Sequence, residues 1–343
     1  MVKSYQLNIK SVTCPVCNSR SGQLLWSVNS HQAAQHFVLI EKDPKRFLEL
    51  ASHIENLWGQ TICEVVRCNN CQFCFSNPFV GGDKQFYDLA YDRFKYPHWK
   101  WEHKRAYDIL HGIASPDLHL LEVGAGDGSF IKRIVPHIFS KKQILCTEFS
   151  DYGRKRIQEF GIECLSDDVR NLNKFEFRGL FNFVCMFQML EHMDNLISLF
   201  SKLHWLMQEE ANLFISVPNP LRIQFYELNG ALLDMPPNHV GRWNRMCFEE
   251  IARRTGFHLE CYEIEPLNFL SMTKQFMKYR FLRKSQDGKS LANRITKVKQ
   301  KNLRLPLQAM GAAVELLMSF SILGRIEKTM GNSLWVHLKK KRN

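Results

Sequence analysis

The chain has 343 residues, of which 45% are hydrophobic and 23% are charged. This length accommodates a domain of about 200 residues and a smaller one, and the composition is that of a soluble globular protein. Residues 1–10 carry lysines but no apolar core, so we expect no signal peptide there. Eleven cysteines without a secretory signal favour a reducing compartment, the cytoplasm, where thiols serve as metal ligands or small core residues.

The net charge of +12 belongs mainly to one segment near the C-terminus. Between Lys274 and Arg304 there are eleven Lys and Arg against one acid, Asp287, which gives this segment a charge of +10. The rest of the chain is therefore nearly neutral, and the basic character does not describe the whole fold.

Two paired C-x-x-C knuckles lie in the first 80 residues, and their members are Cys14, Cys17, Cys68 and Cys71. Each knuckle places two thiolates at the spacing that holds tetrahedral zinc, and the metal can replace a core too small to fold alone. Four reduced structural cysteines are the alternative, and Cys74 could replace one ligand. The 50 residues between the knuckles must contain an inserted element, and 44–58 has the apolar spacing of a helix.

Residues 75–98 are rich in aromatic and turn-forming residues and are expected to link this module to the next domain. A helix is expected over 99–113, with Trp101, Ala106, Ile109 and Leu110 on its apolar face. This helix would cover a bound cofactor or simply pack on a sheet, and the two roles are compatible.

From His119 onward, strand and helix patterns alternate. Strands are expected at 120–123, 143–147, 162–165, 181–187 and 213–217, and helices at 151–160, 196–207 and from 245 to about 255. Continuous apolar strands joined by short loops predict a doubly wound parallel sheet. Ligands bind such sheets at the carboxyl ends of the strands. The polar residues at those ends are Glu122, Glu148, Asp167, Asp168 and 188–192.

The first of these strands leads into three glycines at alternate positions, Gly124, Gly126 and Gly128, and a helical pattern begins at Phe130. Glycine allows a sharp turn and a close approach of the backbone to a ligand. Strand, turn and helix together form a cradle for a nucleotide-type ligand. The spacing does not fit the dinucleotide fingerprint G-x-G-x-x-G, and an ordinary glycine-rich turn is the alternative.

Two acids follow at the ends of the second and third strands. Glu148 lies twenty residues after Gly128, where a carboxylate can accept from both hydroxyls of a ribose, although it could also be a solvated rim residue. Asp168, rather than Asp167, would accept from an adenine amino group, and Val169 would pack on the ring.

Glu122 followed by G-x-G-x-G resembles motif I of the class I S-adenosylmethionine-dependent methyltransferases. The segment from Phe187 to His192 (F-Q-M-L-E-H) resembles the V-L-E-H signature of their ubiquinone-biosynthesis-like and type 23 groups, and the resemblance covers 120–217. It implies a Rossmann-like seven-stranded sheet and S-adenosylmethionine as cofactor, with Gln188 and Glu191 at the cofactor. Glu191 and His192 would also line the substrate mouth, unless the backbone merely holds His192 at a helix N-terminus. Asn182 stands where these families usually have an acid.

A second stretch, 234–244, places two prolines before His239 and Trp243. It resembles the P-P-H-H-x-x-x-W loop of zinc-ribbon-bearing methyltransferases that act on sugars and other small metabolites, with Asn238 in place of the first His. His239 is the expected general base or substrate ligand, because an imidazole accepts a proton near neutral pH. A histidine that only hydrogen-bonds the loop is the alternative.

The tail combines the basic segment with an apolar stretch, 305–323, which Pro306, Gly311 and Glu315 interrupt. These residues favour a buried or interfacial amphipathic helix over a membrane span. Residues 333–340 alternate in polarity and are expected to form the final edge strand of the sheet. The basic segment then becomes an insertion that contacts anionic lipid or a phosphorylated substrate, or a solvated helix face.

We therefore expect an α/β protein with a zinc-ribbon-like module at 1–80, a linker and lid helix at 81–118, a methyltransferase core at 119–265 and a helical insertion with the final strand at 266–343. The expected activity is methyl transfer to a small metabolite, such as a nucleotide- or lipid-linked sugar. A ribosomal RNA base methyltransferase is an alternative, but no [DN]-P-P-[FY] element follows the fourth strand. A non-catalytic zinc-dependent interaction protein is another, against which the glycine loop and Glu148 count.

Overall fold

The computed structural model describes residues 8–9, 12–91, 99–113, 115, 117–135, 137–228, 234–285, 289–298, 300–318 and 324–342. The chain divides into two compact units. The smaller comprises residues 219–234 and 264–332, and the larger comprises 2–218, 235–263 and 333–343. The larger unit contains two sheets, whereas the described elements of the smaller unit are helices.

The larger sheet has seven strands in the order β11-β12-β9-β8-β5-β6-β7. Their bounds are β5 Leu120–Val123, β6 Ile144–Thr147, β7 Glu163–Leu165, β8 Phe181–Phe187, β9 Met207–Pro218, β11 Phe257–Ile264 and β12 Ser333–Lys340. The pairs β5–β6, β6–β7, β5–β8 and β8–β9 are parallel, and β12 runs antiparallel to β9. The doubly wound, seven-stranded sheet predicted from the sequence is confirmed.

The position of the last strand differs from the expectation. β12 is not an edge strand, because β11, for which the sequence pattern predicted no strand, lies outside it. The burial of β12 agrees with an inner position, since Leu334, Trp335, Val336 and Leu338 are all fully buried.

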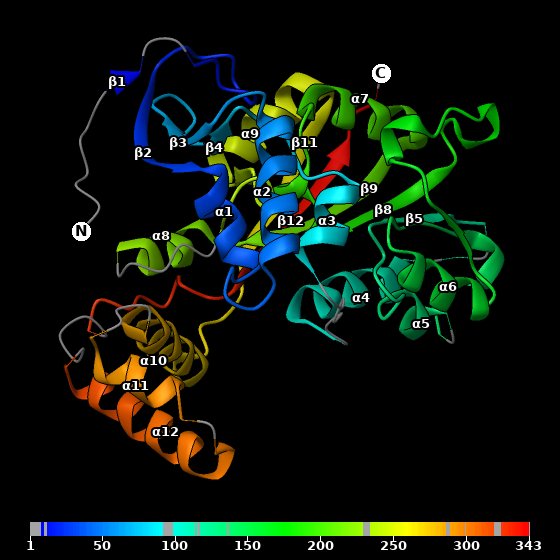
Figure 1. Cartoon of the computed structure of the whole chain (residues 1–343). Helices are drawn as coiled ribbons and strands as arrows, with labels where there is room; N and C mark the ends of the chain where they lie inside the picture. The colour runs from blue at the N-terminus through cyan, green and yellow to red at the C-terminus, as the bar shows by residue number, and fades with distance from the viewer. Residues whose placement is uncertain are drawn as a thin grey trace. The chain divides into compact units, whose positions relative to one another are not determined.

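Helices cover both faces of this sheet (Figure 1). On one side lie α4 (Trp101–Ile113), α5 (Ile131–Ile134) and α6 (Asp151–Glu159), and on the other α7 (Leu196–Leu206) and α9 (Arg245–Thr255). Short 3-10 turns complete the unit: η1 Lys141–Gln143, η2 Val169–Asn171, η3 Phe175–Phe177 and η4 Leu190–His192. One core cluster joins the apolar faces of α4, α5 and α6 to β5, β6 and β8, so the carboxyl ends of these strands are held rigidly relative to one another.

The cysteine-containing module is built on a second sheet with the strand order β1-β2-β3-β4-β10. Its strands are β1 Asn8–Ile9, β2 Gly22–Asn29, β3 Ile62–Cys68, β4 Cys74–Asn77 and β10 Gly241–Arg242. Helices α1 (Ser30–Phe37) and α2 (Pro44–Trp58) are inserted between β2 and β3, and α3 (Lys84–Ala90) follows β4. The helix predicted at 44–58 is confirmed, with Asp43 as its N-cap and a left-handed Gly59 at its end.

The smaller unit contains α8 (Pro220–Leu228), α10 (Phe269–Ser285), α11 (Leu291–Thr296) and α12 (Lys301–Met318). Gly311 lets α12 approach α10 and α11, since a Cβ there would lie 2.7 Å from the ring of Phe281. The apolar side chains of α12 are largely exposed rather than buried, because α12 packs mainly through this one face. Among the described residues, no helix is both long and apolar enough to cross a membrane.

Candidate active site

The glycine turn after β5 needs glycine for conformational and for steric reasons. Gly124, Gly126 and Gly128 have φ angles of +70°, +59° and +78°. These values fall in the left-handed region that residues with a side chain rarely adopt. At Gly124 a Cβ would also lie 2.3 Å from the side chain of Met189. The backbone therefore turns at the carboxyl end of β5 and packs directly against the segment that follows β8.

Glu148 bridges this turn to the start of α6. Its Oε2 accepts from the backbone N–H of Gly126, and its Oε1 from the backbone N–H of Ser150, each at 2.8 Å. Gly153 makes this approach of α6 possible, since a Cβ there would lie 2.4 Å from the carbonyl oxygen of Gly126. The role of Gly153 was not predicted from the sequence. Its position three residues after Ser150, the N-cap of α6, could have indicated a close backbone approach.

Glu122 is a buried carboxyl group directly before the glycine turn. It is 3% exposed, and burial, followed by the charges of Glu148 and Asp127, raises its pKa well above the ordinary value of 4.5. Its Oε2 is buried and has no hydrogen-bond partner in the part of the chain that the structure describes. A cationic ligand group would satisfy this oxygen and stabilise the ionised form. The residue thus fits the positively charged methionine portion of S-adenosylmethionine.

Asp168 lies at the end of β7 and is bound to an arginine. Arg170 donates to Asp168 Oδ1 at 2.9 Å and to its Oδ2 at 2.6 Å, and it also reaches Asp194 Oδ1 at 2.7 Å. The neighbouring Asp167 is exposed. A carboxylate offers about four lone-pair positions, so Asp168 can still accept one more donor. The Arg170 bridge was not predicted from the sequence, because Arg170 and Asp194 are 24 residues apart.

Gln188, at the end of β8, has a left-handed φ of +54°. Its side-chain Nε2 lies 3.2 Å from Glu102 Oε1 on α4 and 3.3 Å from the hydroxyls of Ser216 and Ser333. Glu102 is 1% exposed and was not recognised from the sequence, in which it appears as one acid on a helix. Gln188 thus connects the helix expected to act as a lid to the central strands.

The three residues Glu191, His192 and His239 come together although 47 positions separate the histidines. Their potential ligand atoms all lie within 4.8 Å of one another. The two imidazole rings are in edge contact, with centroids 4.7 Å apart. The Nδ1 of His192 lies 2.6 Å from the carbonyl oxygen of Asn238 and 3.1 Å from the hydroxyl of Tyr87. All three residues were candidate site residues in the sequence, whereas Tyr87 was not.

The loop that carries His239 is held between the η4 turn and the cysteine module. Val240 N donates to the carbonyl of Glu191 at 2.8 Å, and Val240 O accepts from Ser76 N at 2.9 Å. Immediately afterwards, β10 pairs antiparallel with β4. Trp243 is fully buried against Phe73, with ring centroids 4.9 Å apart. The cysteine module therefore helps to position the loop that carries His239.

Residues 98–262 match the family described as methyltransferase domain, and this range includes the glycine turn, Glu148, Glu191, His192 and His239. This part of the chain is a methyltransferase domain. It is accordingly an enzyme. No curated protein matches the sequence.

Solved structures that resemble this methyltransferase include a SAM-dependent methyltransferase from Archaeoglobus fulgidus, with 18% identity, a TM-score of 0.43, and coverage of 69% of this chain and 90% of that one. The cyclopropane synthase MmaA2 from Mycobacterium tuberculosis has 14% identity and a TM-score of 0.42, with 69% and 84% covered. Phosphoethanolamine N-methyltransferase 2 from Haemonchus contortus has 16% identity and a TM-score of 0.42, and the match covers 76% of this chain and 58% of that one.

The four knuckle cysteines of the methyltransferase form one cluster. Cys14 Sγ lies 3.6 Å from Cys71 Sγ, and Cys17 Sγ lies 3.5 Å from Cys68 Sγ. Four thiolates at about 2.3 Å from one tetrahedral ion would lie roughly 3.8 Å apart, so the cluster fits zinc. Hydrogen bonds, the largest from the backbone of Ser19, outweigh the effect of burial and lower the pKa of Cys17 to about 7. Cys74 is not in the cluster and lies 3.8 Å from the carbonyl of Gln72.

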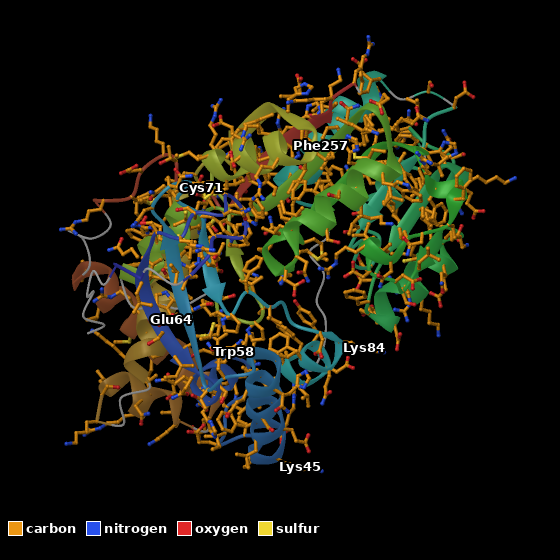
Figure 2. The ribbon with its side chains drawn as sticks, turned by 90° about the horizontal axis from the view of Figure 1, so that it is seen from above. Lys45, Trp58, Glu64, Cys71, Lys84 and Phe257 are labelled. Atoms are coloured by element: carbon orange, nitrogen blue, oxygen red, sulfur yellow. The ribbon has the colours of Figure 1, made fainter. Side chains whose placement is uncertain are left out.

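The second knuckle also contacts the helix that follows the His239 loop. Cys71 lies at the end of the module remote from Lys45 of α2 (Figure 2). Its carbonyl oxygen accepts from Cys247 Sγ at 3.4 Å and from Asn244 Nδ2 at 3.4 Å. Asn244 is the N-cap of α9, so the knuckle is joined to the start of that helix.

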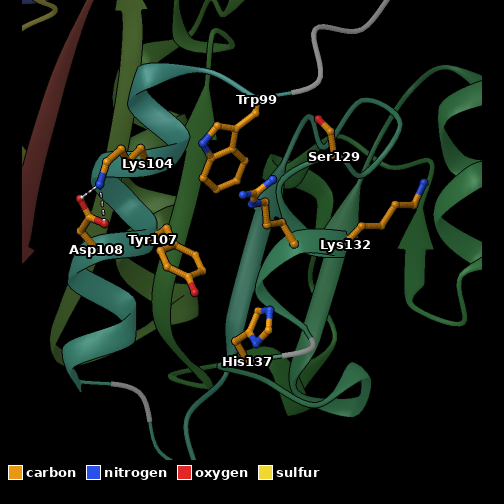
Figure 3. A pocket seen from close by; sticks show the side chains of 8 residues that line it. Trp99, Lys104, Tyr107, Asp108, Ser129, Lys132 and His137 are labelled. Atoms are coloured by element: carbon orange, nitrogen blue, oxygen red, sulfur yellow. Dashed lines mark hydrogen bonds and ion pairs between the residues drawn. The ribbon is translucent and has the colours of Figure 1, made fainter.

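A separate hollow of about 620 Å³ lies between α4 and α5 (Figure 3). Its lining is mainly basic and aromatic and consists of Trp99, Lys104, Tyr107, Asp108, Ser129, Lys132, Arg133 and His137. Arg133 lies over the ring of Trp99 at 4.7 Å. None of the site residues predicted from the sequence lines this hollow, so it is not the site assembled at the carboxyl ends of the strands.

Proposed function

We propose that this methyltransferase acts on a hydroxyl group of a small metabolite, such as a nucleotide- or lipid-linked sugar. The observation that carries the proposal is the meeting of His192 and His239 beside Glu191, next to the segment that packs on the glycine turn. A hydroxyl acceptor must lose a proton during transfer, and two imidazoles at the acceptor side provide groups that can promote this loss.

The cofactor would be held by residues at the carboxyl ends of β5 to β8. The cofactor would pack closely against the backbone at Gly124, Gly126 and Gly128, and Glu122 would balance its positive charge. Glu148 would accept from the ribose hydroxyls in place of one of its present backbone donors, and Asp168 would accept from the adenine amino group. Gln188 and Glu191 would border its methionine side.

S-adenosylmethionine supplies a methyl group on a positively charged sulfur. The protein then has to align the acceptor oxygen with the methyl–sulfur bond and exclude water, so positioning dominates catalysis. His192 is oriented for this task by the carbonyl of Asn238, and His239 by a loop held between Glu191 and Ser76. These residues would bind the acceptor and promote removal of its proton.

Purified protein can be incubated with radiolabelled S-adenosylmethionine and candidate nucleotide sugars, and S-adenosylhomocysteine binding can be measured by calorimetry. We expect transfer to a hydroxyl-bearing acceptor, and we expect His239→Ala to lower kcat about 10²- to 10⁴-fold without changing S-adenosylhomocysteine affinity. His258→Ala is the matched control, because His258 is a partly exposed residue of β11 that pairs with Glu260. Binding of S-adenosylhomocysteine without transfer to any acceptor hydroxyl would contradict the proposed substrate class.

We also infer that Cys14, Cys17, Cys68 and Cys71 hold Zn²⁺. The sulfur–sulfur distances support this, as does the backbone N–H of Asn70, which lies 3.4 Å from Cys68 Sγ in the manner of a zinc knuckle. Elemental analysis should give one zinc per chain, and Cys17→Ser should lose it while Cys261→Ser retains it. A full zinc content in Cys17→Ser would exclude this ligand set.

We also propose that the smaller unit makes a peripheral contact with an anionic lipid surface. Five apolar side chains of α12 are exposed by 38–76% and recur at intervals of four and three, namely Leu303, Leu307, Met310, Val314 and Leu317. This spacing puts them on one stripe of the helix, beside a segment that carries a charge of +10. Sedimentation with anionic vesicles should retain the protein, and Leu307→Gln with Leu317→Gln should release it. Equal binding to neutral vesicles would contradict the charge-based contact.

A further inference from the structure

We propose that Glu191, His192 and His239 bind a divalent first-row transition-metal ion, such as Mn²⁺ or Fe²⁺, which in turn ligates the acceptor hydroxyl. Binding of the ion stands on the geometry alone, whereas its role in the reaction rests on the methyl transfer proposed above. This site is separate from the four-cysteine cluster in sequence, in donor type and in place.

The distances between the ligand atoms of Glu191, His192 and His239 suit a shared metal ion better than direct hydrogen bonds between the side chains. His192 Nε2 lies 3.9 Å from Glu191 Oε1, beyond the usual length of a hydrogen bond. Two ligands at about 2.1 Å from one ion lie roughly 3 to 4 Å apart for angles between about 90° and 135°. All three ligand atoms lie within 4.8 Å of one another, so a small rotation of the side chains would bring each of them to ligand distance from a single ion.

The tautomer of His192 follows from its partner. A carbonyl oxygen can only accept a hydrogen bond, so the 2.6 Å contact with Asn238 O places the proton on Nδ1. Nε2 then carries the lone pair, on the side of the ring that faces Glu191. Histidines that ligate metals commonly donate their other N–H to a backbone carbonyl in this way, which fixes the ring orientation.

The chemistry of the three side chains also favours a cation. Glu191 is 2% exposed, and burial of a carboxylate is costly unless positive charge lies close to it. Two imidazoles and one carboxylate form a facial set that selects transition metals and leaves further coordination positions open. A carboxylate and imidazole set accepts Mn²⁺, whereas the four thiolates of the knuckle cluster favour Zn²⁺.

An ion here would explain how the acceptor is activated. A hydroxyl that ligated such an ion would have a lowered pKa and would release its proton to solvent more readily. Its oxygen lone pair then forms the new oxygen–methyl bond as the methyl–sulfur bond breaks, which yields the methyl ether and neutral S-adenosylhomocysteine. Under this proposal the two histidines act as metal ligands rather than as proton acceptors.

The test is a Mn²⁺ titration of the full chain, whose cysteine cluster is first loaded with one equivalent of Zn²⁺. Electron paramagnetic resonance then measures the free Mn²⁺. We expect one Mn²⁺ per chain in the wild type and at least a tenfold weaker affinity in Glu191→Gln, His192→Ala and His239→Ala. His258→Ala should bind as the wild type does. Because an alanine variant can fail to fold, His239→Asn is included, and S-adenosylhomocysteine binding reports the integrity of each variant.

No Mn²⁺ binding by the wild type up to millimolar concentrations would overturn the proposal, as would wild-type affinity in variants that still bind S-adenosylhomocysteine. Activity measured with and without Mn²⁺ separates this proposal from the proposed function. If Mn²⁺ binds but no hydroxyl acceptor is methylated, the metal site stands and the proposed substrate class fails. If methylation proceeds fully without Mn²⁺ and no ion binds, the substrate class stands and the metal site fails.

Discussion

The two sides of the proposed active site, one for the cofactor and one for the methyl acceptor, are assembled in different ways. The cofactor side comes from one continuous part of the chain, in which the glycine turn, Glu148 and Asp168 follow successive parallel strands. The acceptor side joins three remote segments, represented by Tyr87, His192 and Asn238. A side built from consecutive strands depends on local geometry, whereas a side built from remote segments depends on the module that holds them together. Four substitutions test whether the two sides depend on different parts of the chain.

The largest expected effect is loss of the cysteine cluster through Cys68→Ser. Structural zinc contributes roughly 10–16 kcal/mol of folding free energy in small metal-dependent domains, so removal of one ligand should lower the stability of the module by several kcal/mol. Because β10 pairs with β4 of that module and directly follows the His239 loop, we expect methyl transfer to be lost while S-adenosylhomocysteine still binds. Urea unfolding and calorimetry measure the two effects. Cys261→Ser is the matched control. If Cys68→Ser lost S-adenosylhomocysteine binding as well as methyl transfer, the two sides would not be independent.

The second change, Gly124→Ala, should affect the cofactor side alone. A left-handed residue with a side chain costs about 1–2 kcal/mol, and Met189 must also move, because the new Cβ would lie 2.3 Å from it. Gly59→Ala is a close control, since Gly59 has a similar φ of +63° but a Cβ added there would meet nothing within 4 Å. We expect both variants to lose stability in urea unfolding and only Gly124→Ala to lose S-adenosylhomocysteine affinity, about tenfold or more. Unchanged affinity in Gly124→Ala would argue against this turn as the cofactor site.

The contrast between the two sides also explains what could be predicted from the sequence. Six of the seven strands of the larger sheet, the three glycines, Glu148 and the four cysteines were predictable, because each depends on a short pattern in the chain. Asn182, which stands where related families usually have an acid, accepts a hydrogen bond from His119 N at 2.9 Å. The cofactor roles of these residues remain predictions.

Contacts between remote segments could not be predicted in this way. No local pattern indicates that 241–242 would join the sheet of the cysteine module, or that Arg170 would bridge Asp168 and Asp194. The order of β11 and β12 was missed for a similar reason, since a strand's neighbour is decided by the whole sheet rather than by its own alternation. The exposed face of α12 likewise depends on which side of the helix its neighbours leave uncovered.

The third change, Glu122→Gln, tests electrostatics at the cofactor side. Because the folded protein holds the Glu122 proton more tightly than the unfolded chain does, stability should fall as pH rises above about 4.5 and level off once pH passes the raised pKa. Each unit of the raised pKa corresponds to about 1.4 kcal/mol. The glutamine variant should lack this pH-dependent loss and be more stable at neutral pH, yet bind S-adenosylmethionine more weakly. Glu176→Gln, at an exposed site, should show neither effect. Parallel pH–stability curves for the wild type and Glu122→Gln would contradict the assignment.

The smallest expected effect is on the acceptor side, in Tyr87→Phe. Burial raises the pKa of the Tyr87 phenol above its ordinary value of 10, so the hydroxyl stays neutral across the working pH range. It lies 3.1 Å from His192 Nδ1, which also donates to Asn238 O at 2.6 Å, so the phenol is the weaker of two partners of that nitrogen. Its removal should cost about 1 kcal/mol, or roughly fivefold in kcat/KM, with S-adenosylhomocysteine affinity unchanged. The pH–rate profile should run parallel to that of the wild type, because no ionisation is removed. A loss of several hundredfold would mean that Tyr87 rather than Asn238 determines the orientation of His192.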